Sequence, residues 1–173
     1  RLNRYTTTGG ALKKARYRWS WERKFNRGAD DDYTTLFDLV ETVNASPADY
    51  VQRMEASINI EAWLTAIALR HAVGDYDGYG YDRGKNQFIY LPPRGQWHML
   101  LWDLDFSLGC NGGRSTTDDI FDHDTGDGSL NTLYNHPHFR RAYYRALERC
   151  MNGPFLPANL LPRLTERYNA FVA

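Results

Sequence analysis

The chain has 173 residues, a length that suits one domain with its own hydrophobic core, so we expect residues 1–173 to form a single domain. Its 21 Lys and Arg residues balance its 21 Asp and Glu residues, and the resulting zero net charge argues against a dedicated nucleic-acid-binding protein. No apolar run of about 18 residues occurs, so the sequence predicts no membrane-spanning segment.

The N-terminal part of the chain is basic. Within it, ALKKARYRWSWE (residues 11–22) alternates imperfectly between apolar and polar side chains, which predicts a strand or a hairpin. The polar segment 28–33 then precedes a predicted helix, with Asp32 as a candidate cap. The apolar residues of this helix follow at helical spacing: Leu36, Phe37, Leu39, Val40 and Val43.

Two more helices are predicted in the first half of the chain. Ser46 and Pro47 have the pattern of an N-cap followed by proline at the first helical position. The clearest helical pattern covers residues 57–73, where an apolar stripe has one polar member, His71. We expect His71 to be a hydrogen-bonded core residue rather than a catalytic one.

A β-hairpin is predicted after the loop GDYDGYGYDRGKN (74–86). QFIYL (87–91) and WHMLLW (97–102) have the composition of strands, and the Pro and Gly residues of PPRGQ (92–96) between them suit a turn. The chain therefore contains one predicted two-stranded unit among several predicted helices.

The C-terminal third is predicted to be a long loop followed by helices. Residues 110–128 are rich in Gly, Asp and Thr, which is typical of a loop. Helices are expected over 130–151 and over 157–171, the second opened by Pro157. The complete order predicts an α+β fold in which helices pack beside a small hairpin.

Acidic side chains lie on both sides of the predicted hairpin. Because a hairpin brings its two ends together, residues 77–86 are expected to lie beside Asp103 and Asp105. Carboxylates repel one another, so a cation should compensate them, and oxygen ligands of this kind suit Mg²⁺ or Mn²⁺. Because Mg²⁺ is commonly held by one or two carboxylates plus substrate phosphates, the pattern suggests a nucleotide site. In a strand, Asp103 and Asp105 would share one face, and Trp102 and Leu104 would point into the core.

The stretch GDYDGYGYDRGKNQFIYL (74–91), followed by WHMLLWDLDFSLG (97–109), resembles the CotH kinase family, the spore-coat-protein-H-like proteins. ALKKARYRWSWE and LYNHPHFRRAYYRAL resemble other parts of the same family, so the resemblance covers most of the chain. It implies an atypical protein-kinase-like fold, mainly the helical large lobe with a hairpin that carries the metal site, without most of the N-terminal small lobe.

The resemblance also implies an activity and a location. The activity is transfer of phosphate from ATP to Ser or Thr of a protein substrate, with Mg²⁺ or Mn²⁺. The location is outside the cytoplasm of a bacterium, as a secreted, cell-surface or spore-coat protein. Matched by position, Asp77 is the catalytic-loop Asp, Asn86 is the metal-binding Asn, and Asp103 or Asp105 is the metal-binding Asp that follows the hairpin.

Two further residues receive cofactor roles from the resemblance. Lys14 would contact the nucleotide phosphates, and Glu22 would be its ion-pair partner. Asp75 and Asp82 stay open as alternatives to Asp77 for the catalytic role.

Other functions and one structural question also stay open. The chain could be a non-catalytic pseudokinase or a calcium-stabilised surface or coat scaffold, because no glycine-rich phosphate loop precedes Lys14. DHDTGDG (122–128) alternates acidic residues like a calcium loop but lacks the Glu that closes an EF-hand, which favours a flexible acidic loop. A glycosidase would use two carboxylates on either side of a sugar bond. Cys110 and Cys150 either pair, in an extracellular protein, or are two free thiols.

Overall fold

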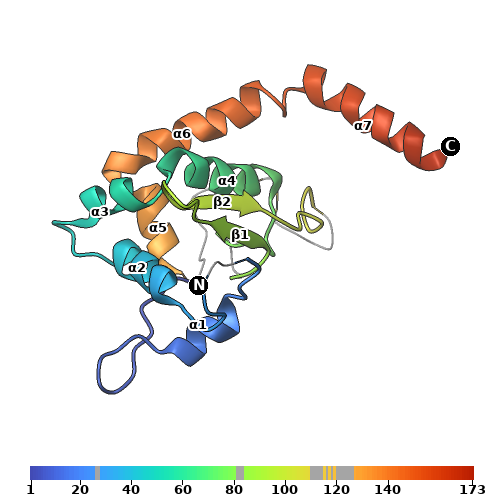
Figure 1. Cartoon of the computed structure of the whole chain (residues 1–173). Coiled ribbons are helices and arrows are strands. Elements are labelled where there is room, and N and C mark those ends of the chain that lie inside the picture. Colours follow the sequence, from blue (N-terminus) through green and yellow to red (C-terminus); the bar gives the residue numbers. More distant parts are fainter. Residues whose placement is uncertain (26–27, 81–83, 110–114, 116, 118, 120–126) are drawn as a thin grey trace.

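A computed structural model describes residues 1–25, 28–80, 84–109, 115, 117, 119 and 127–173. In these residues the fold is α+β, as predicted, with seven helices and one two-stranded antiparallel sheet (Figure 1). The elements in chain order are α1 (Lys14–Ser20), α2 (Thr34–Val43), α3 (Tyr50–Ser57), α4 (Ile60–Val73), β1 (Gln87–Tyr90), β2 (His98–Leu101), α5 (Gly128–Asn135), α6 (Pro137–Asn152) and α7 (Pro157–Val172). No helix in the described part has both the length and the apolar character needed to cross a membrane.

Helix α4 forms the centre of the molecule. It lies between α6 on one side and β2 on the other (Figure 1). Trp63, Leu64 and Ile67 of α4 are fully buried, which places the core along this helix. The helix ends at Val73, and Gly74 caps it with a left-handed φ of 66°.

The prediction of a helix over 57–73 is confirmed, but the helix begins three residues later. Residues 57–59 instead bind the segment before β2, because the backbone N–H of Trp97 donates to the carbonyl of Ser57 at 2.8 Å. The N–H of Asn59 donates in turn to the carbonyl of Trp97 at 3.0 Å. The Asn59 side chain then caps the helix by accepting from the N–H of Ala62 at 3.0 Å.

The predicted hairpin is confirmed. β1 and β2 pair antiparallel, with Phe88 opposite Leu100 and Ile89 opposite Met99. Met99 is buried against the α4 side of the sheet, whereas Leu100 is 48% exposed on the other side. The hairpin is therefore attached to α4 by one face, and this attachment fixes where its two ends lie.

The prediction of a strand or hairpin over 11–22 is wrong, because residues 14–20 form α1. Ala, Lys and Arg are strong helix formers, and they dominate this segment. The helix is anchored by Tyr17, which is 1% exposed and whose hydroxyl donates to the carbonyl of Asn3 at 2.8 Å. Tyr17 also packs edge-on against Phe37 of α2, so one aromatic anchor, rather than alternation, decides the local structure.

The predicted helix after the polar segment 28–33 is confirmed as α2. Asp32 accepts from the N–H of Thr34 at 2.9 Å, although it lies one residue outside the cap position. The helix expected to begin at Pro47 begins at Tyr50 instead, because residues 46–49 form a turn in which the N–H of Asp49 donates to the carbonyl of Ser46.

The region predicted as one helix over 130–151 contains two, α5 and α6. The break lies at His136, which is extended with a ψ of 129° because the following Pro137 disfavours helical backbone at the residue before it. Pro137 then opens α6, and the helix opened by Pro157 is confirmed as α7.

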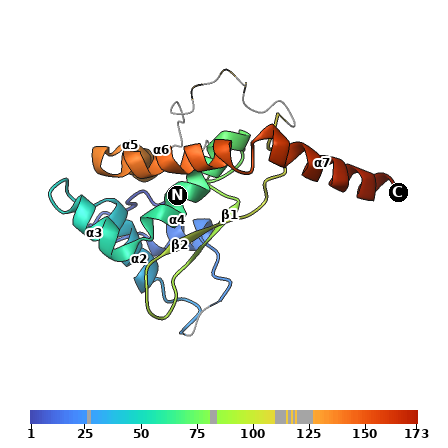
Figure 2. The same cartoon turned by 90° about the horizontal axis from the view of Figure 1, so that it is seen from above.

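Helix α7 projects from the body of the molecule, as two perpendicular views show (Figures 1 and 2). None of its residues is buried. Its apolar side chains recur at helical spacing on one face, and they are exposed: Leu161, Leu164, Tyr168, Phe171 and Val172. Cys150, near the end of α6, is a buried free thiol, and Cys110 lies outside the described residues.

Candidate functional site

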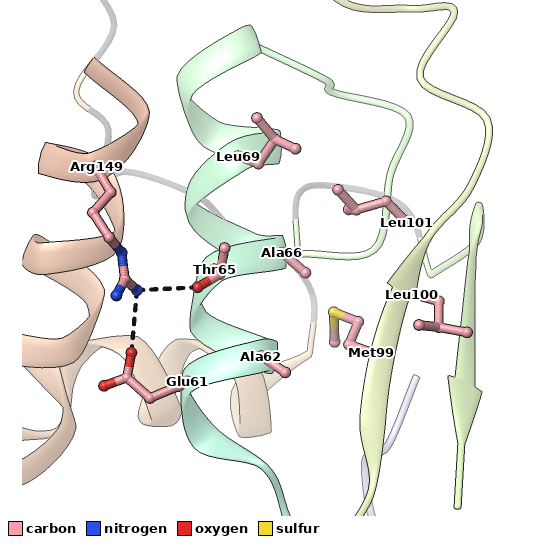
Figure 3. A pocket seen from close by; sticks show the side chains of 9 residues that line it. All are labelled: Glu61, Ala62, Thr65, Ala66, Leu69, Met99, Leu100, Leu101 and Arg149. Atoms are coloured by element: carbon pink, nitrogen blue, oxygen red, sulfur yellow. Dashed lines mark hydrogen bonds and ion pairs between the residues drawn. The ribbon is translucent and has the colours of Figure 1, made fainter. Parts of the chain in front are cut away.

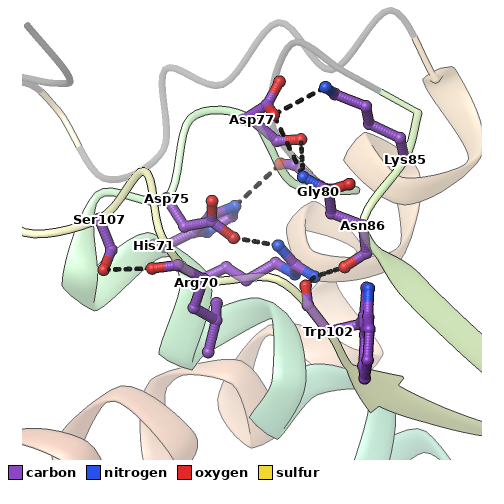
Figure 4. Close-up of polar contacts among 10 residues, drawn as sticks. Arg70, His71, Asp75, Asp77, Gly80, Lys85, Asn86, Trp102 and Ser107 are labelled. Carbon is purple, nitrogen blue, oxygen red and sulfur yellow. Dashed lines mark hydrogen bonds and ion pairs between the residues drawn. The ribbon is translucent and has the colours of Figure 1, made fainter. Parts of the chain in front are cut away.

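The candidate site lies at the open end of the hairpin, where three segments meet (Figure 4). They are the turn 74–80 after α4, residues 84–86 before β1, and residues 102–107 after β2. The convergence predicted from hairpin geometry is therefore confirmed for the described residues. Asp82, an alternative catalytic residue, lies outside them.

A buried guanidinium joins these three segments. Arg70, in the last turn of α4, is 0% exposed. Its Nη1 donates to Oδ2 of Asp75 in the turn. Its Nη2 donates to the carbonyl of Asn86 before β1 and, at 3.1 Å, to the carbonyl of Trp102 after β2.

The charge of Arg70 is surrounded by carboxylates. Burial lowers the pKa of Arg70, and the negative charges of Asp75, Asp103 and Asp77 act in the opposite direction. Burial likewise raises the pKa of Asp75, and Arg70 opposes this shift, while Asp77 and Asp105 add to it. Four carboxylates thus share one electrostatic neighbourhood, and a protein cation compensates part of their repulsion.

Asp77 is held by two neighbours from the segment before β1. The side-chain amide of Asn86 donates to Oδ2 of Asp77 at 3.1 Å, and Lys85 Nζ lies 2.8 Å from the same oxygen (Figure 4). Asp77 itself is only 6% exposed. The structure therefore brings together two of the predicted site residues, Asp77 and Asn86, in direct contact.

Asn86 and Asp103 both have left-handed backbone conformations, with φ of 63° and 57°. Non-glycine residues rarely adopt this region, although Asn and Asp tolerate it best, and such residues cluster at functional sites. One precedes the hairpin and the other follows it. The chain thus turns sharply at two of the three predicted metal-binding positions, Asn86 and Asp103.

The expectation that Asp103 and Asp105 share one face of a strand is wrong. β2 ends at Leu101, and the left-handed turn at Asp103 interrupts the alternation that the expectation required. Both carboxylates are exposed, and Trp102, expected in the core, is 59% exposed, while Leu104 is partly buried.

The segment after β2 is fixed to the turn after α4 by two further contacts. The rings of Tyr76 and Phe106 lie 5.7 Å apart, so the residue between Asp75 and Asp77 packs on the residue after Asp105. The backbone N–H of Leu108 donates to the carbonyl of Val73 at 2.7 Å. Asp103 and Asp105 are therefore held near Asp75 and Asp77 by backbone and ring contacts.

Lys14 and Glu22 do not form the expected ion pair. Lys14 Nζ lies 2.6 Å from Asp31, and Glu22 lies 2.8 Å from Lys24. Lys14 belongs to a helix rather than a strand, which changes the direction of its side chain and places it near the loop that precedes α2. The cofactor roles of Lys14 and Glu22 stay predictions.

His71 is a hydrogen-bonded core residue, as predicted. Its Nε2 lies 3.0 Å from the carbonyl of Gly80, and its Nδ1 lies 2.5 Å from the hydroxyl of Tyr143 in α6. Because a carbonyl only accepts, Nε2–H of His71 donates to Gly80. His71 thus fixes the far end of the acidic turn to the core.

Sequence reasoning missed Arg70 and Lys85. A signal for Arg70 was present, because a charged residue beside His71 in an otherwise apolar helix needs a buried partner. Asp75, five residues further on, is that partner. Lys85 directly precedes Asn86, and its role became apparent only from its contact with Asp77.

The described residues fit a divalent cation that is held partly by its substrate. The predicted ligands Asp103 and Asp105 have exposed carboxylates, and Asn86 adds an amide oxygen, and oxygen donors of this kind suit Mg²⁺. Among the described residues no group of three or more His, Cys, Asp or Glu side chains is arranged to hold a metal alone. Mg²⁺ commonly takes only one or two carboxylates from the protein.

Two other features lie apart from this site. An open groove of about 650 Å³ lies between α4 and β2, with Arg149 of α6 at its rim bonded to Glu61 and Thr65 (Figure 3). In the calcium-loop-like segment, residues 122–126 lie outside the described part. Asp127, which follows, accepts hydrogen bonds from protein groups at both carboxylate oxygens.

A family model described as CotH kinase protein matches residues 2–172, nearly the whole chain. No curated protein and no solved structure gives a significant match. The family match and the resemblance in the segments around the hairpin agree. The chain belongs to the CotH kinase family.

Proposed function

We propose that this chain is an atypical protein kinase with a kinase-like fold, which transfers phosphate from ATP to Ser or Thr of a protein. The observation that carries the proposal is the contact between Asp77 and Asn86 at the open end of the hairpin, with Asp103 and Asp105 held nearby. Membership of the CotH kinase family supports it. As the resemblance implies, we propose that the protein acts outside the cytoplasm of a bacterium.

In this proposal Asp77 is the catalytic carboxylate. The acceptor hydroxyl oxygen attacks the γ-phosphorus of ATP, the bond to the β–γ bridging oxygen breaks, and ADP leaves with that electron pair. The hydroxyl proton passes to Asp77. Asn86 and Lys85 hold the Asp77 carboxylate in one orientation, which limits the ways in which it can approach the hydroxyl.

Asp77 is better suited to this role than Asp75. Asp75 is 0% exposed, and its Oδ2 is paired with Arg70, so it cannot reach a substrate without breaking a buried ion pair. Asp77 lies closer to the surface, and its neighbour Lys85 is half exposed.

Asn86, Asp103 and Asp105 would hold Mg²⁺ or Mn²⁺, and when bound the ion would neutralise charge on the ATP phosphates. The site has four carboxylates and two protein cations, so two formal negative charges remain, which match one divalent cation. The carboxylates are those of Asp75, Asp77, Asp103 and Asp105, and the cations are Arg70 and Lys85. Lys14 stays the proposed phosphate-binding residue, whereas Glu22, its predicted ion-pair partner, contacts Lys24 instead. Lys85 adds a cation beside Asp77.

The test is phosphate transfer from γ-labelled ATP to the chain itself and to a general protein acceptor, with Mg²⁺ or Mn²⁺. Asp77→Asn keeps the shape of the side chain but removes the proton acceptor, so we expect the rate to fall by about 10²–10⁴-fold. Asp38→Asn, an exposed change on α2, is the matched control and should keep the wild-type rate. Equal rates in wild type and Asp77→Asn would contradict the assignment of Asp77.

Absence of transfer in every variant, with binding of ATP intact, would favour the pseudokinase alternative. Absence of both transfer and ATP binding would favour the scaffold alternative.

A further inference from the structure

We infer that Arg70 is a positioning residue, which assembles the phosphotransfer site by fixing Asn86 and the residue before Asp103 to the acidic turn after α4. That the site transfers phosphate rests on the proposed function. That Arg70 holds the site together rests on the geometry of its contacts. Arg70 touches none of the atoms that react in the proposed mechanism. It acts through the three chain segments that it joins.

The first argument is the pattern of contacts. One guanidinium donates to the Asp75 carboxylate and to two main-chain carbonyls at the open end of the hairpin, that of Asn86 before β1 and that of Trp102 after β2 (Figure 4). A planar fork of donors can satisfy several acceptors in fixed directions, which a lysine ammonium cannot do. Arg70 therefore sets the distance between the two hairpin ends and between each end and the turn.

The second argument is the position of the two carbonyls. The Asn86 carbonyl belongs to a residue with a φ of 63°, and the Trp102 carbonyl immediately precedes Asp103, whose φ is 57°. Uncommon backbone conformations persist only where the surrounding structure holds them. The hydrogen bonds from Arg70 are placed to hold both of these turns, and the two turns aim the proposed metal-binding side chains.

The third argument is the space reserved for the fork. A Cβ atom added at Gly78 would overlap Nη1 of Arg70 and lie 2.5 Å from Oδ2 of Asp75. The turn Asp75-Tyr76-Asp77-Gly78 thus supplies a partner for the guanidinium and leaves room for it. The turn and the end of α4 thus fit each other, which indicates that the buried ion pair of Arg70 and Asp75 is a specific feature of the site.

The fourth argument is electrostatic. A buried ion pair is weak evidence for stability, because removing two charges from water can cost more than their attraction returns. Arg70 keeps one positive charge beside the carboxylates of Asp75, Asp77 and Asp103, so these can approach one another before a metal or nucleotide binds. A positioning role therefore explains why Arg70 is buried here, whereas a contribution to stability does not.

The test compares three forms of the protein. Arg70→Lys keeps the charge and removes the fork. The double variant Arg70→Met with Asp75→Leu replaces the ion pair by apolar side chains, so that no buried charge is left without a partner. Arg145→Lys, an exposed arginine on α6 paired with Glu61, is the matched control.

The first readout is amide hydrogen exchange without ligand. We expect faster exchange than in wild type over residues 84–87 and 102–106 in Arg70→Lys and in the double variant, with α4 and α6 unchanged. The second readout is the Mn²⁺ concentration for half-maximal binding of ATP. We expect it to rise by about 10–100-fold, the usual effect of removing a residue that orients metal ligands. Arg145→Lys should change neither.

The inference would be overturned by a folded Arg70 variant in which both segments exchange at the wild-type rate and the Mn²⁺ concentration for half-maximal ATP binding is unchanged. If the wild-type chain binds no Mn²⁺ and ATP, the proposed function fails, and hydrogen exchange alone then decides the role of Arg70. If Arg70→Lys does not fold, the double variant decides. Gly78→Ala provides a third variant, which displaces the fork without removing its charge, and it should also speed exchange over both segments.

Discussion

Asp127 is a buried carboxylate outside the candidate site, and several partners hold it. It is 1% exposed, and its Oδ2 accepts from the backbone N–H of Leu2 at 2.7 Å and from the hydroxyl of Tyr79 at 2.9 Å. Its Oδ1 accepts from the N–H and the hydroxyl of Ser129. One carboxylate thus joins the N-terminal segment, the acidic turn and the start of α5.

Replacing Asp127 by Ala should lower the stability of the whole domain. The change leaves the donors of Leu2, Tyr79 and Ser129 without their acceptor, and a buried donor left unpaired costs about 1–3 kcal/mol. We expect the free energy of unfolding, measured with urea, to fall by about 3 kcal/mol. Asp38→Ala, at an exposed position of α2, is the control, and a similar small change in both variants would contradict this account.

At the scale of elements, the local sequence pattern predicted a helix or strand correctly where the long-range packing of that element agrees with the pattern. The hairpin and α4 were predictable because turn residues and apolar periodicity agree with the way these elements pack. α1 was not predictable in this way. Its alternating side chains predicted a strand, whereas the burial and hydrogen bond of one aromatic residue, Tyr17, hold the segment as a helix. The break between α5 and α6 follows from Pro137, a signal that was visible in the sequence.

Helix α7 should contribute little to the stability of the domain. None of its residues is buried, so ending the chain after Leu156 removes no core contact. We expect the free energy of unfolding to change by less than about 1 kcal/mol, in the range of surface changes. The measurement is urea unfolding of the shortened chain and of the 173-residue chain. A markedly larger loss would show that the apolar face of α7 packs against the domain in solution.

At the scale of the molecule, sequence reasoning predicted where the site lies but not how it is held together. The meeting of Asp77, Asn86 and Asp103 follows from hairpin pairing, which is a local property. The compensating charge was expected from a metal ion, and the structure provides Arg70 as well. Such a contact depends on how α4 packs against the hairpin, and the linear spacing of acidic residues carries no information about that packing.

The most direct test of the proposed function is thermal unfolding of the chain with ATP alone, with Mg²⁺ or Mn²⁺ alone, and with both, repeated on Asp103→Ala and Asp105→Ala. A ligand that binds only the folded state stabilises it by about 2.7 kcal/mol at about 100 times its Kd. For a chain of this size that energy corresponds to a rise in Tm of about 5–10 °C.

We predict that metal and ATP together raise the Tm of wild type far more than either alone. The rise should be lost or reduced in Asp103→Ala, in Asp105→Ala or in both, according to which carboxylate holds the metal, while the variants still unfold cooperatively. No rise in wild type under any combination, or a full rise in both Asp variants, would contradict a nucleotide site at the open end of the hairpin.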